Sequence, residues 1–280
     1  MSGKYLGKRF KIIVFVGFLL VLLAMISLIP LSESYAAADT RSSYIVFDAD
    51  AFVPLVAENE HMELPMASTT KIMTALLAIE NLPLEKIITI KKEMTGIEGS
   101  SVYLQEGENL SVRELLYCMM LRSGNDSAVA LALSVADTID DFAAVMNEKA
   151  KDLNLIHTHF INPHGLHDDR HYTSAYDLGF LASVAMKNRI FRDIVSTKKI
   201  AIGENEGKRT LINKNKILSL YEGANGIKTG YTKKSGRCLV SSATRDGRTL
   251  VCVVMNYGDT YGLSRRLLDE GFRRILCANA

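Results

Sequence analysis

The sequence predicts an α+β fold: an antiparallel sheet built from both chain ends and flanked by helices, with a mostly helical second lobe. Three observations lead to this expectation. Residues 39–64 hold two short strand-like runs, the middle of the chain carries apolar residues at helical spacing, and residues 227–255 return to strand patterns before a final amphipathic helix. If strands from both ends share one sheet, the helices must cover its faces.

The first 38 residues are typical of a targeting segment. Four basic residues precede an apolar run over about 12–31, and three alanines follow at 36–38. This pattern predicts a cleaved signal peptide. The run is also long enough for an uncleaved membrane anchor, which needs about 20 apolar residues. Both alternatives put residues 39–280 outside the cytoplasm.

Charge gives no sign of a nucleic-acid partner. The chain has 33 basic and 31 acidic residues, of which four basic and one acidic lie in the first 38, so the remainder carries 29 against 30. No basic surplus is left for a phosphate backbone. The hydrophobic fraction of 48% over 280 residues is enough for a large core.

The four cysteines favour buried free thiols over a disulfide framework. Cys238 and Cys252 flank a predicted two-residue turn at 246–247, so that Cys252 would lie opposite Ser241 and Cys238 opposite Met255. The two thiols would then face opposite sides of the sheet. Bridges between other pairs are left open by the pattern.

The folded region begins with a predicted strand pair and a helix. Residues 44–47 and 53–56 flank a turn-rich stretch. From Pro65 to about residue 80, apolar residues recur at helical spacing behind a Ser/Thr cluster, which is a helix start signal. A short strand over 86–90 and a surface loop over 94–109 follow.

The middle of the chain predicts helices. Ser111 and Glu114 form a capping box that opens one helix. It stops at 122–126, where Asp126 is expected to cap a second helix over 127–136. The next expected elements are a helix over 140–153, a polar, His-rich loop over 157–174 and a helix over 177–188.

The last third predicts three consecutive antiparallel strands and a closing helix. β-branched enrichment and the turn at 246–247 support the strands. The expected elements are strands over 227–231, 237–243 and 249–255 and an amphipathic helix over 264–276.

Three short motifs carry the chemistry. Ser68-x-x-Lys71 puts a hydroxyl and an amine on one face of a helix start, which suits a serine nucleophile with a neighbouring base. Ser123-Gly-Asn125 falls at the break between two helices, and Lys228-Thr-Gly230 on a strand of the terminal sheet. Ser-x-x-Lys alone is common and recurs at Ser196–Lys199. The three motifs in this order match the signature set of penicillin-binding proteins and class A β-lactamases, with Gly in place of the usual Asp in the second.

Longer stretches sharpen the resemblance, which covers about residues 40–275. The sequence closely resembles the D-alanyl-D-alanine carboxypeptidases, the low-molecular-mass penicillin-binding proteins with a β-lactamase/transpeptidase-like fold. The resemblance implies a bacterial serine peptidase that removes the terminal D-Ala of peptidoglycan stem pentapeptides and is acylated by β-lactam antibiotics. The matching stretches are ASTTKIMT (67–74), SGNDSAVA (123–130), NPHGL (162–166), YTSAYDL (172–178) and GIKTGYT (226–232).

The resemblance also implies the catalytic roles. Ser68 matches the nucleophile, Lys71 the base for acylation and Ser123 a proton relay to the leaving group. The amine of Lys71 must be at least partly neutral for this role, which burial and a second cation such as Lys228 would promote.

The remaining roles concern substrate binding. Asn125 matches a substrate amide contact, and Lys228 with Thr229 the groups that hold the terminal carboxylate. Backbone N–H groups of the nucleophile and of Tyr231 match the oxyanion hole, and Gly230 lets the backbone approach. Alternation turns Lys228 and Thr229 to opposite faces, so both can serve one site only from an edge strand.

One cation of the family pattern is missing. A basic residue sometimes found shortly before the last helix is replaced by Thr260. Arg245, Arg265 and Arg266 are candidates to substitute for it, and the sequence does not choose among them.

The His-rich loop invites comparison with a metal site. No pair of potential ligands in it has helical or zinc-ribbon spacing, and the family chemistry needs no metal. We therefore expect no metal and no cofactor. The resemblance implies that His164 lies near the cleft.

The sequence leaves two alternative functions open. A β-lactamase of the same fold would use a glutamate to position water for deacylation, and no E-x-x-L-N run occurs between residues 126 and 228. A non-catalytic penicillin- or wall-binding module would not need the intact polar motifs. Many family members carry a further β-rich domain and a C-terminal amphipathic helix that this sequence lacks, so membrane contact is expected only through the N-terminal segment.

Overall fold

The computed structural model describes residues 42–203 and 208–278. The segment predicted to target the chain, residues 1–38, lies outside the described residues. Within the described ranges, no helix has the length and apolar character needed to cross a membrane.

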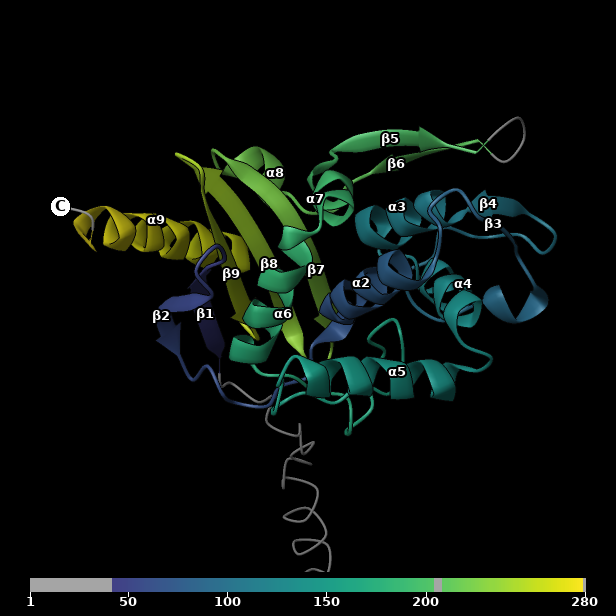
Figure 1. Ribbon diagram of the computed structural model, residues 1–280, viewed down its shortest axis with the longest axis horizontal. Coiled ribbons are helices and arrows are strands. Elements are labelled where there is room, and N and C mark those ends of the chain that lie inside the picture. The colour runs from purple at the N-terminus through teal and green to yellow at the C-terminus, as the bar shows by residue number, and fades with distance from the viewer. Residues whose placement is uncertain (1–41, 204–207, 279–280) are drawn as a thin grey trace, which may run out of the picture. The chain divides into compact units, whose positions relative to one another are not determined.

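A five-stranded antiparallel sheet forms the centre, with the strand order β2-β1-β9-β8-β7 (Figure 1). β1 pairs with β9, which joins the two ends of the folded region and confirms the predicted sheet. The sheet is therefore complete only when the last strands have been added. The strands are β1 (Ser43–Asp48), β2 (Val53–Glu58), β7 (Ala224–Thr232), β8 (Gly236–Arg245) and β9 (Arg248–Met255).

The β8–β9 hairpin has the predicted two-residue turn, and Ser241 lies opposite Cys252. Cys238 packs in the core on one side of the sheet and Cys252 in the core on the other. Cys118 is also buried, whereas Cys277 is exposed, and all four thiols are free. The expectation of buried free thiols is confirmed for Cys118, Cys238 and Cys252 but is wrong for Cys277. The register of the β8–β9 hairpin separates Cys238 from Cys252.

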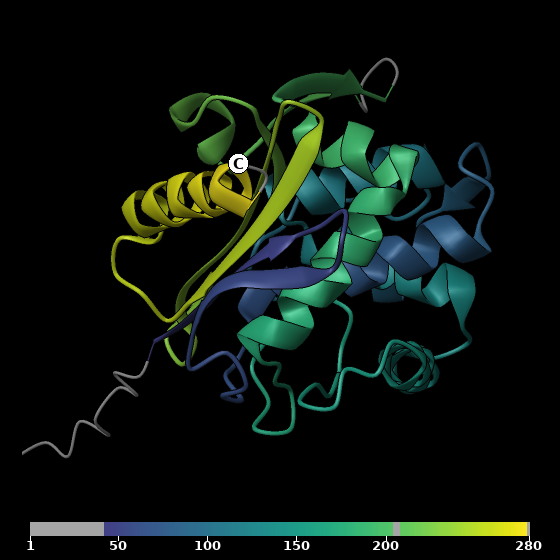
Figure 2. The same ribbon diagram turned by 60° about the vertical axis from the view of Figure 1, so that its left-hand side comes forward.

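Helices cover both faces of the sheet (Figure 2). On one face, α9 (Thr260–Ala278) places Leu268 and Phe272 against apolar residues of β9. On the other face, α6 (Ala175–Lys187) packs on β1 and β9 and leads into the helical lobe.

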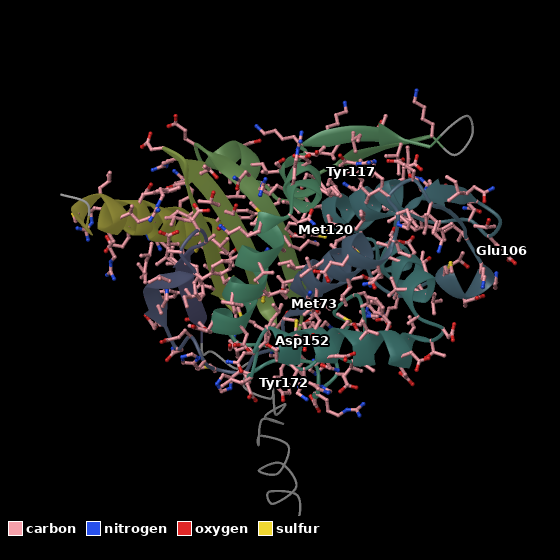
Figure 3. The ribbon with its side chains drawn as sticks, viewed as in Figure 1. Met73, Glu106, Tyr117, Met120, Asp152 and Tyr172 are labelled. Atoms are coloured by element: carbon pink, nitrogen blue, oxygen red, sulfur yellow. The ribbon has the colours of Figure 1, made fainter. Side chains whose placement is uncertain are left out.

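The second lobe is mostly helical, as predicted. In its interior, Met73 of α2 is fully buried and Met120 of α3 nearly so (Figure 3). α2 packs against α3, α4 and α5, so its N-terminal end is held between the lobe and the sheet. The four helices are α2 (Lys71–Asn81), α3 (Val112–Arg122), α4 (Asn125–Val135) and α5 (Ile139–Asp152).

Several short elements complete the described chain. β3 pairs with β4 and β5 with β6 as separate two-stranded ribbons. Of these four strands, only β3 was expected from the sequence, because β4, β5 and β6 are too short or too polar to show an alternation of apolar and polar residues. The elements are 3-10 turns η1 (Ala67–Thr70) and η2 (Lys92–Met94), strands β3 (Ile87–Thr89), β4 (Asn109–Ser111), β5 (Lys199–Ile202) and β6 (Arg209–Ile212), and helices α7 (Arg189–Ser196) and α8 (Ile217–Leu220).

The capping box of Ser111 and Glu114 is confirmed, but the predicted cap at Asp126 is wrong. The break between α3 and α4 is so short that Gly124 takes the N-cap position and Asp126 falls in the first turn of α4. The Asp126 carboxylate accepts the backbone N–H groups of Val102, at 3.0 Å, and Leu104, at 3.2 Å. Asp126 therefore anchors the 94–109 loop.

Candidate active site

Ser68 and Lys71 lie at the buried start of α2. Ser68 is in the 3-10 turn η1, and Lys71 is the first residue of the α-helix that continues it. The Lys71 Nζ lies 3.1 Å from Ser68 Oγ. It also donates to Asn125 Oδ1 at 2.7 Å and to the His164 carbonyl at 2.6 Å. Two of the three sequence motifs thus meet at one fully buried amine.

The backbone just before Ser68 has an unusual conformation. Ala67 has a φ of 48°, in the left-handed region that non-glycine residues seldom adopt. The Thr70 hydroxyl donates to the Ala67 carbonyl at 2.8 Å, which helps to hold it. A Cβ on Gly165 would lie 1.9 Å from the same carbonyl oxygen, and Gly165 has a φ of 89°. The loop that carries Gly165 can therefore pack against η1 only with glycine at this position.

The third motif reaches the site from the edge of the sheet. β7 lies at the edge of the sheet. This position was expected, because Lys228 and Thr229 point to opposite faces of the strand and can serve one site only from an edge. The Lys228 Nζ donates to Ser123 Oγ and to the Thr229 carbonyl, at 3.0 Å each. Ser123 ends α3 with a φ of 66°, in the left-handed C-cap conformation. This conformation aims its hydroxyl at the strand.

Gly230 brings β7 directly against η1. A Cβ at this position would lie 3.2 Å from the Ser68 nitrogen and 3.1 Å from Ala67 Cβ. A side chain at this position would require its neighbours in η1 to shift by a few tenths of an ångström. The backbone of Gly230 therefore lies close to the Ser68 N–H.

Burial dominates the electrostatics of the two lysines. It lowers the pKa of Lys71 well below the usual value, and the charges of Lys228 and Lys214 lower it further, against an opposing effect of Asp126. Burial, followed by the charge of Lys214, lowers the pKa of Lys228 to about 7. The site thus favours a neutral Lys71 amine.

A pocket of about 380 Å³ opens on this cluster. None of the predicted substitute cations, Arg245, Arg265 and Arg266, lines it. Arg245 instead lies 3.4 Å from Asp269 and stacks on aromatic rings of the α9 side. None of the three candidate arginines therefore lies at this pocket. The pocket is lined by Ser68, Ser100, Ser123, Lys214, Lys216, Thr229, Gly230, Tyr231, Arg237, Cys238, Thr260 and Tyr261.

The His-rich loop supports the site through its backbone and through neutral imidazoles. His164 is held near Lys71 by its carbonyl, and burial followed by the charge of Lys71 lowers the pKa of its imidazole to about 3. His171 accepts the Ile161 N–H at Nδ1, so its Nε2, 2.7 Å from the Thr70 hydroxyl, is the protonated nitrogen. Within residues 42–203 and 208–278, no group of three or more potential ligands could hold a metal ion.

Sequence reasoning missed the residues that surround the turn of Ser68. Thr70, Gly165 and His171 belong to stretches that were quoted for the resemblance or lie beside one, but no local pattern shows that they meet around Ala67. Lys214 and Lys216 lie in the segment between β6 and α8, which carries no recognisable motif. Their place at the pocket follows from the fold alone.

Known proteins resemble this chain over most of its length. A family model described as D-alanyl-D-alanine carboxypeptidase matches residues 32–259. The D-alanyl-D-alanine carboxypeptidase DacF of Bacillus subtilis is 34% identical over 223 residues, covering 78% of this chain and 57% of that protein. The D-alanyl-D-alanine carboxypeptidase of Streptomyces sp. (strain K15) is 38% identical over 206 residues, covering 67% of this chain and 71% of that protein.

Solved structures agree with these relatives. The D-alanyl-D-alanine carboxypeptidase from Mycobacterium tuberculosis H37Rv superposes with a TM-score of 0.79 at 32% identity, covering 82% of this chain and 90% of that one. The DD-transpeptidase of Streptomyces K15 gives a TM-score of 0.79 at 32% identity, covering 82% of this chain and 96% of that one. These likenesses extend through both the sheet and the helical lobe.

The fold and the site together define an active-site-serine enzyme of the penicillin-binding class. The chain belongs to the D-alanyl-D-alanine carboxypeptidase family. The two alternatives considered from the sequence, a β-lactamase of the same fold and a non-catalytic binding module, receive no support from these relatives.

Proposed function

We propose that the chain removes the terminal D-Ala of peptidoglycan stem pentapeptides through an acyl-enzyme on Ser68. The observation that carries this proposal is the buried Lys71 amine, 3.1 Å from Ser68 Oγ. A neutral amine has two N–H donors and one lone pair. Asn125 Oδ1 and the His164 carbonyl take the two donors, so the lone pair is left for the Ser68 hydroxyl.

In the first step, Lys71 takes the Ser68 proton as Oγ attacks the carbonyl of the penultimate D-Ala. The N–H groups of Ser68 and Tyr231 stabilise the oxyanion, which the close approach of Gly230 to η1 supports. Ser123, hydrogen-bonded to Lys228, relays the proton that Lys71 has taken up to the leaving amine of the terminal D-Ala, which returns Lys71 to its neutral form. Water then hydrolyses the ester and restores Ser68.

Substrate recognition falls to groups on both sides of the pocket. Lys228 and Thr229 bind the terminal carboxylate, and Asn125 contacts a substrate amide. The Asn125 side chain is already fixed by Lys71 at Oδ1 and by the Glu98 carbonyl at Nδ2, which sets its orientation. A β-lactam would enter the same pocket and acylate Ser68 as a covalent inhibitor.

One pair of assays on the purified full-length protein tests the proposal. A peptide ending in D-Ala-D-Ala should release one equivalent of D-Ala per turnover, and a labelled penicillin should give a long-lived adduct. Rapid hydrolysis of penicillin would instead support the β-lactamase. Absence of both reactions would leave only the non-catalytic module.

The N-terminal segment bears on where this reaction takes place. Because the family acts on peptidoglycan, the folded part works outside the cytoplasm or at the membrane of a bacterium. We propose that residues 1–38 direct export, either as a cleaved signal peptide or as an N-terminal membrane anchor. Sequencing the N-terminus of the exported protein distinguishes the two: a start near residue 39 supports cleavage, and an intact start supports the anchor.

A further inference from the structure

Lys228 is poorly suited to bind a carboxylate alone. Its side chain is 2% exposed, and its Nζ already donates to Ser123 Oγ and to the Thr229 carbonyl. Burial and the charge of Lys214 lower its pKa to about 7, so a large fraction is uncharged near neutral pH. A terminal carboxylate calls for a cation that stays charged in the pocket, which a guanidinium does.

Arg237 of β8 occupies a suitable place. It lies directly opposite Tyr231 in the β7–β8 register. Since side chains alternate along a strand, Arg237 shares a sheet face with Tyr231 and with Thr229, two residues earlier. Arg237 and Thr229 both line the pocket that opens on Ser68. The Arg237 guanidinium lies 5.8 Å from the centre of the Tyr231 ring, near the limit of a cation–π contact.

The guanidinium is also available. Two other arginines, Arg245 of β8 and Arg248 of β9, form ion pairs with Asp269 and Asp48 respectively. Among the described residues, Arg237 takes part in no ion pair. The charged side chains that line the pocket are all basic, namely Lys214, Lys216 and Arg237. A pocket with this lining attracts an anion.

The two lysines are less well placed than Arg237. The Lys214 Nζ lies 3.3 Å from Ser100 Oγ, on the side of the helical lobe. Lys216 is tied through its backbone N–H to the Tyr261 hydroxyl at 3.2 Å. Both belong to the segment between β6 and α8, not to a strand of the sheet. Thr260, which also lines the pocket, brings no charge.

We propose that Arg237 binds the terminal carboxylate of the substrate, with two parallel N–H donors, beside the hydroxyl of Thr229. The inference deepens the proposed function and rests on it, because it assigns the cation that selects substrates with a free carboxylate. In this chain the cation comes from the second strand of the β7–β8 hairpin, not from the start of α9.

The test compares charged and neutral ligands in Arg237→Gln, Arg237→Lys and the control Lys234→Gln. Lys234 is an exposed lysine of the same hairpin that does not line the pocket. The ligands are a D-Ala-D-Ala peptide, its C-terminal amide, a penicillin and the methyl ester of that penicillin. D-Ala or D-alaninamide release gives kcat/KM for the peptides, and intact mass gives the acylation rate for the penicillins.

Arg237→Gln should lower kcat/KM for the carboxylate peptide by about 10- to 100-fold, the range of a charge-assisted hydrogen bond, and leave the amide within about threefold. Arg237→Lys should recover part of the loss, and Lys234→Gln should lose nothing. Equal losses on acid and amide, an unchanged Arg237→Gln enzyme, or an equal loss in Lys234→Gln would overturn the proposal. If the wild-type protein releases no D-Ala, the proposed function fails, while acylation by the penicillin and its ester still tests Arg237.

Discussion

The Lys71 amine and the Ser68 hydroxyl face each other at 3.1 Å, and two further acceptors fix the direction of the contact. Asn125 Oδ1 and the His164 carbonyl lie closer to Nζ than Ser68 does. In the neutral amine they take both N–H groups, which leaves the lone pair for the hydroxyl. The surrounding residues thus orient the base as well as bury it.

Lys214→Gln should move the acid limb of penicillin acylation to higher pH. The charge of Lys214 lowers the pKa of both Lys71 and Lys228, so its removal raises both. At a given pH less of the Lys71 amine is then neutral, and acylation slows. Stopped-flow acylation rates over a pH series measure the limb. Lys216→Gln is the matched control, because Lys216 lines the same pocket but is not among the charges that lower the pKa of Lys71. An unmoved limb, or an equal shift in the control, would contradict the assignment.

Lys228→Met should abolish useful activity yet stabilise the fold by roughly 1–3 kcal/mol at pH 7. The unfolded chain holds the lysine proton up to about pH 10.5, whereas the folded chain releases it near 7. Between these values the unfolded state binds more protons, so wild-type stability rises with pH and the advantage of the variant shrinks. Urea unfolding at pH 7 and 9.5 measures both effects, with the exposed Lys216→Met as control. A variant less stable than wild type at both pH values would refute this account.

Gly165→Ala should cost more than about 3 kcal/mol of folding free energy and slow acylation. The new Cβ would lie 1.9 Å from the carbonyl oxygen of Ala67, which precedes the nucleophile. Gly107→Ala is the control, since Gly107 has a φ of 82° but a Cβ added there would meet no atom within 4 Å. It should cost only about 1 kcal/mol, the backbone strain alone. Thermal melts and acylation rates of the two variants should therefore differ. Similar melting temperatures would show that the clash with Ala67 does not destabilise the Gly165→Ala variant.

The sequence indicated the sheet, the helical lobe and the residues of the three motifs because each rests on a local signal. Period-2 runs predict strands, and the turn at 246–247 predicts the register that separates Cys238 from Cys252. The sequence also predicted that β7 lies at the edge of the sheet, because Lys228 and Thr229 could serve one site only from there. The strand order confirms this position. Local patterns were enough where a segment carries its own periodicity or turn.

The other features depend on contacts between distant segments. Asp126 looks like a cap in sequence, but the short α3–α4 break turns it toward the 94–109 loop. Arg245 carries the right charge for the pocket, but Asp269 of α9 engages it. Gly165 meets Ala67 only after the loop has folded over the nucleophile turn. Such pairings are decided by packing, which no single stretch of sequence shows.

The most direct test of the central claim is to map where a penicillin attaches to the full-length protein. The chain provides its own control, because Ser-x-x-Lys recurs at Ser196 and Lys199, where Ser196 ends α7 and Lys199 begins β5. Mass spectrometry should find one adduct, on the peptide that contains Ser68. The adduct should vanish in Ser68→Ala and persist in Ser196→Ala. An adduct on Ser196, or one that survives Ser68→Ala, would contradict the account.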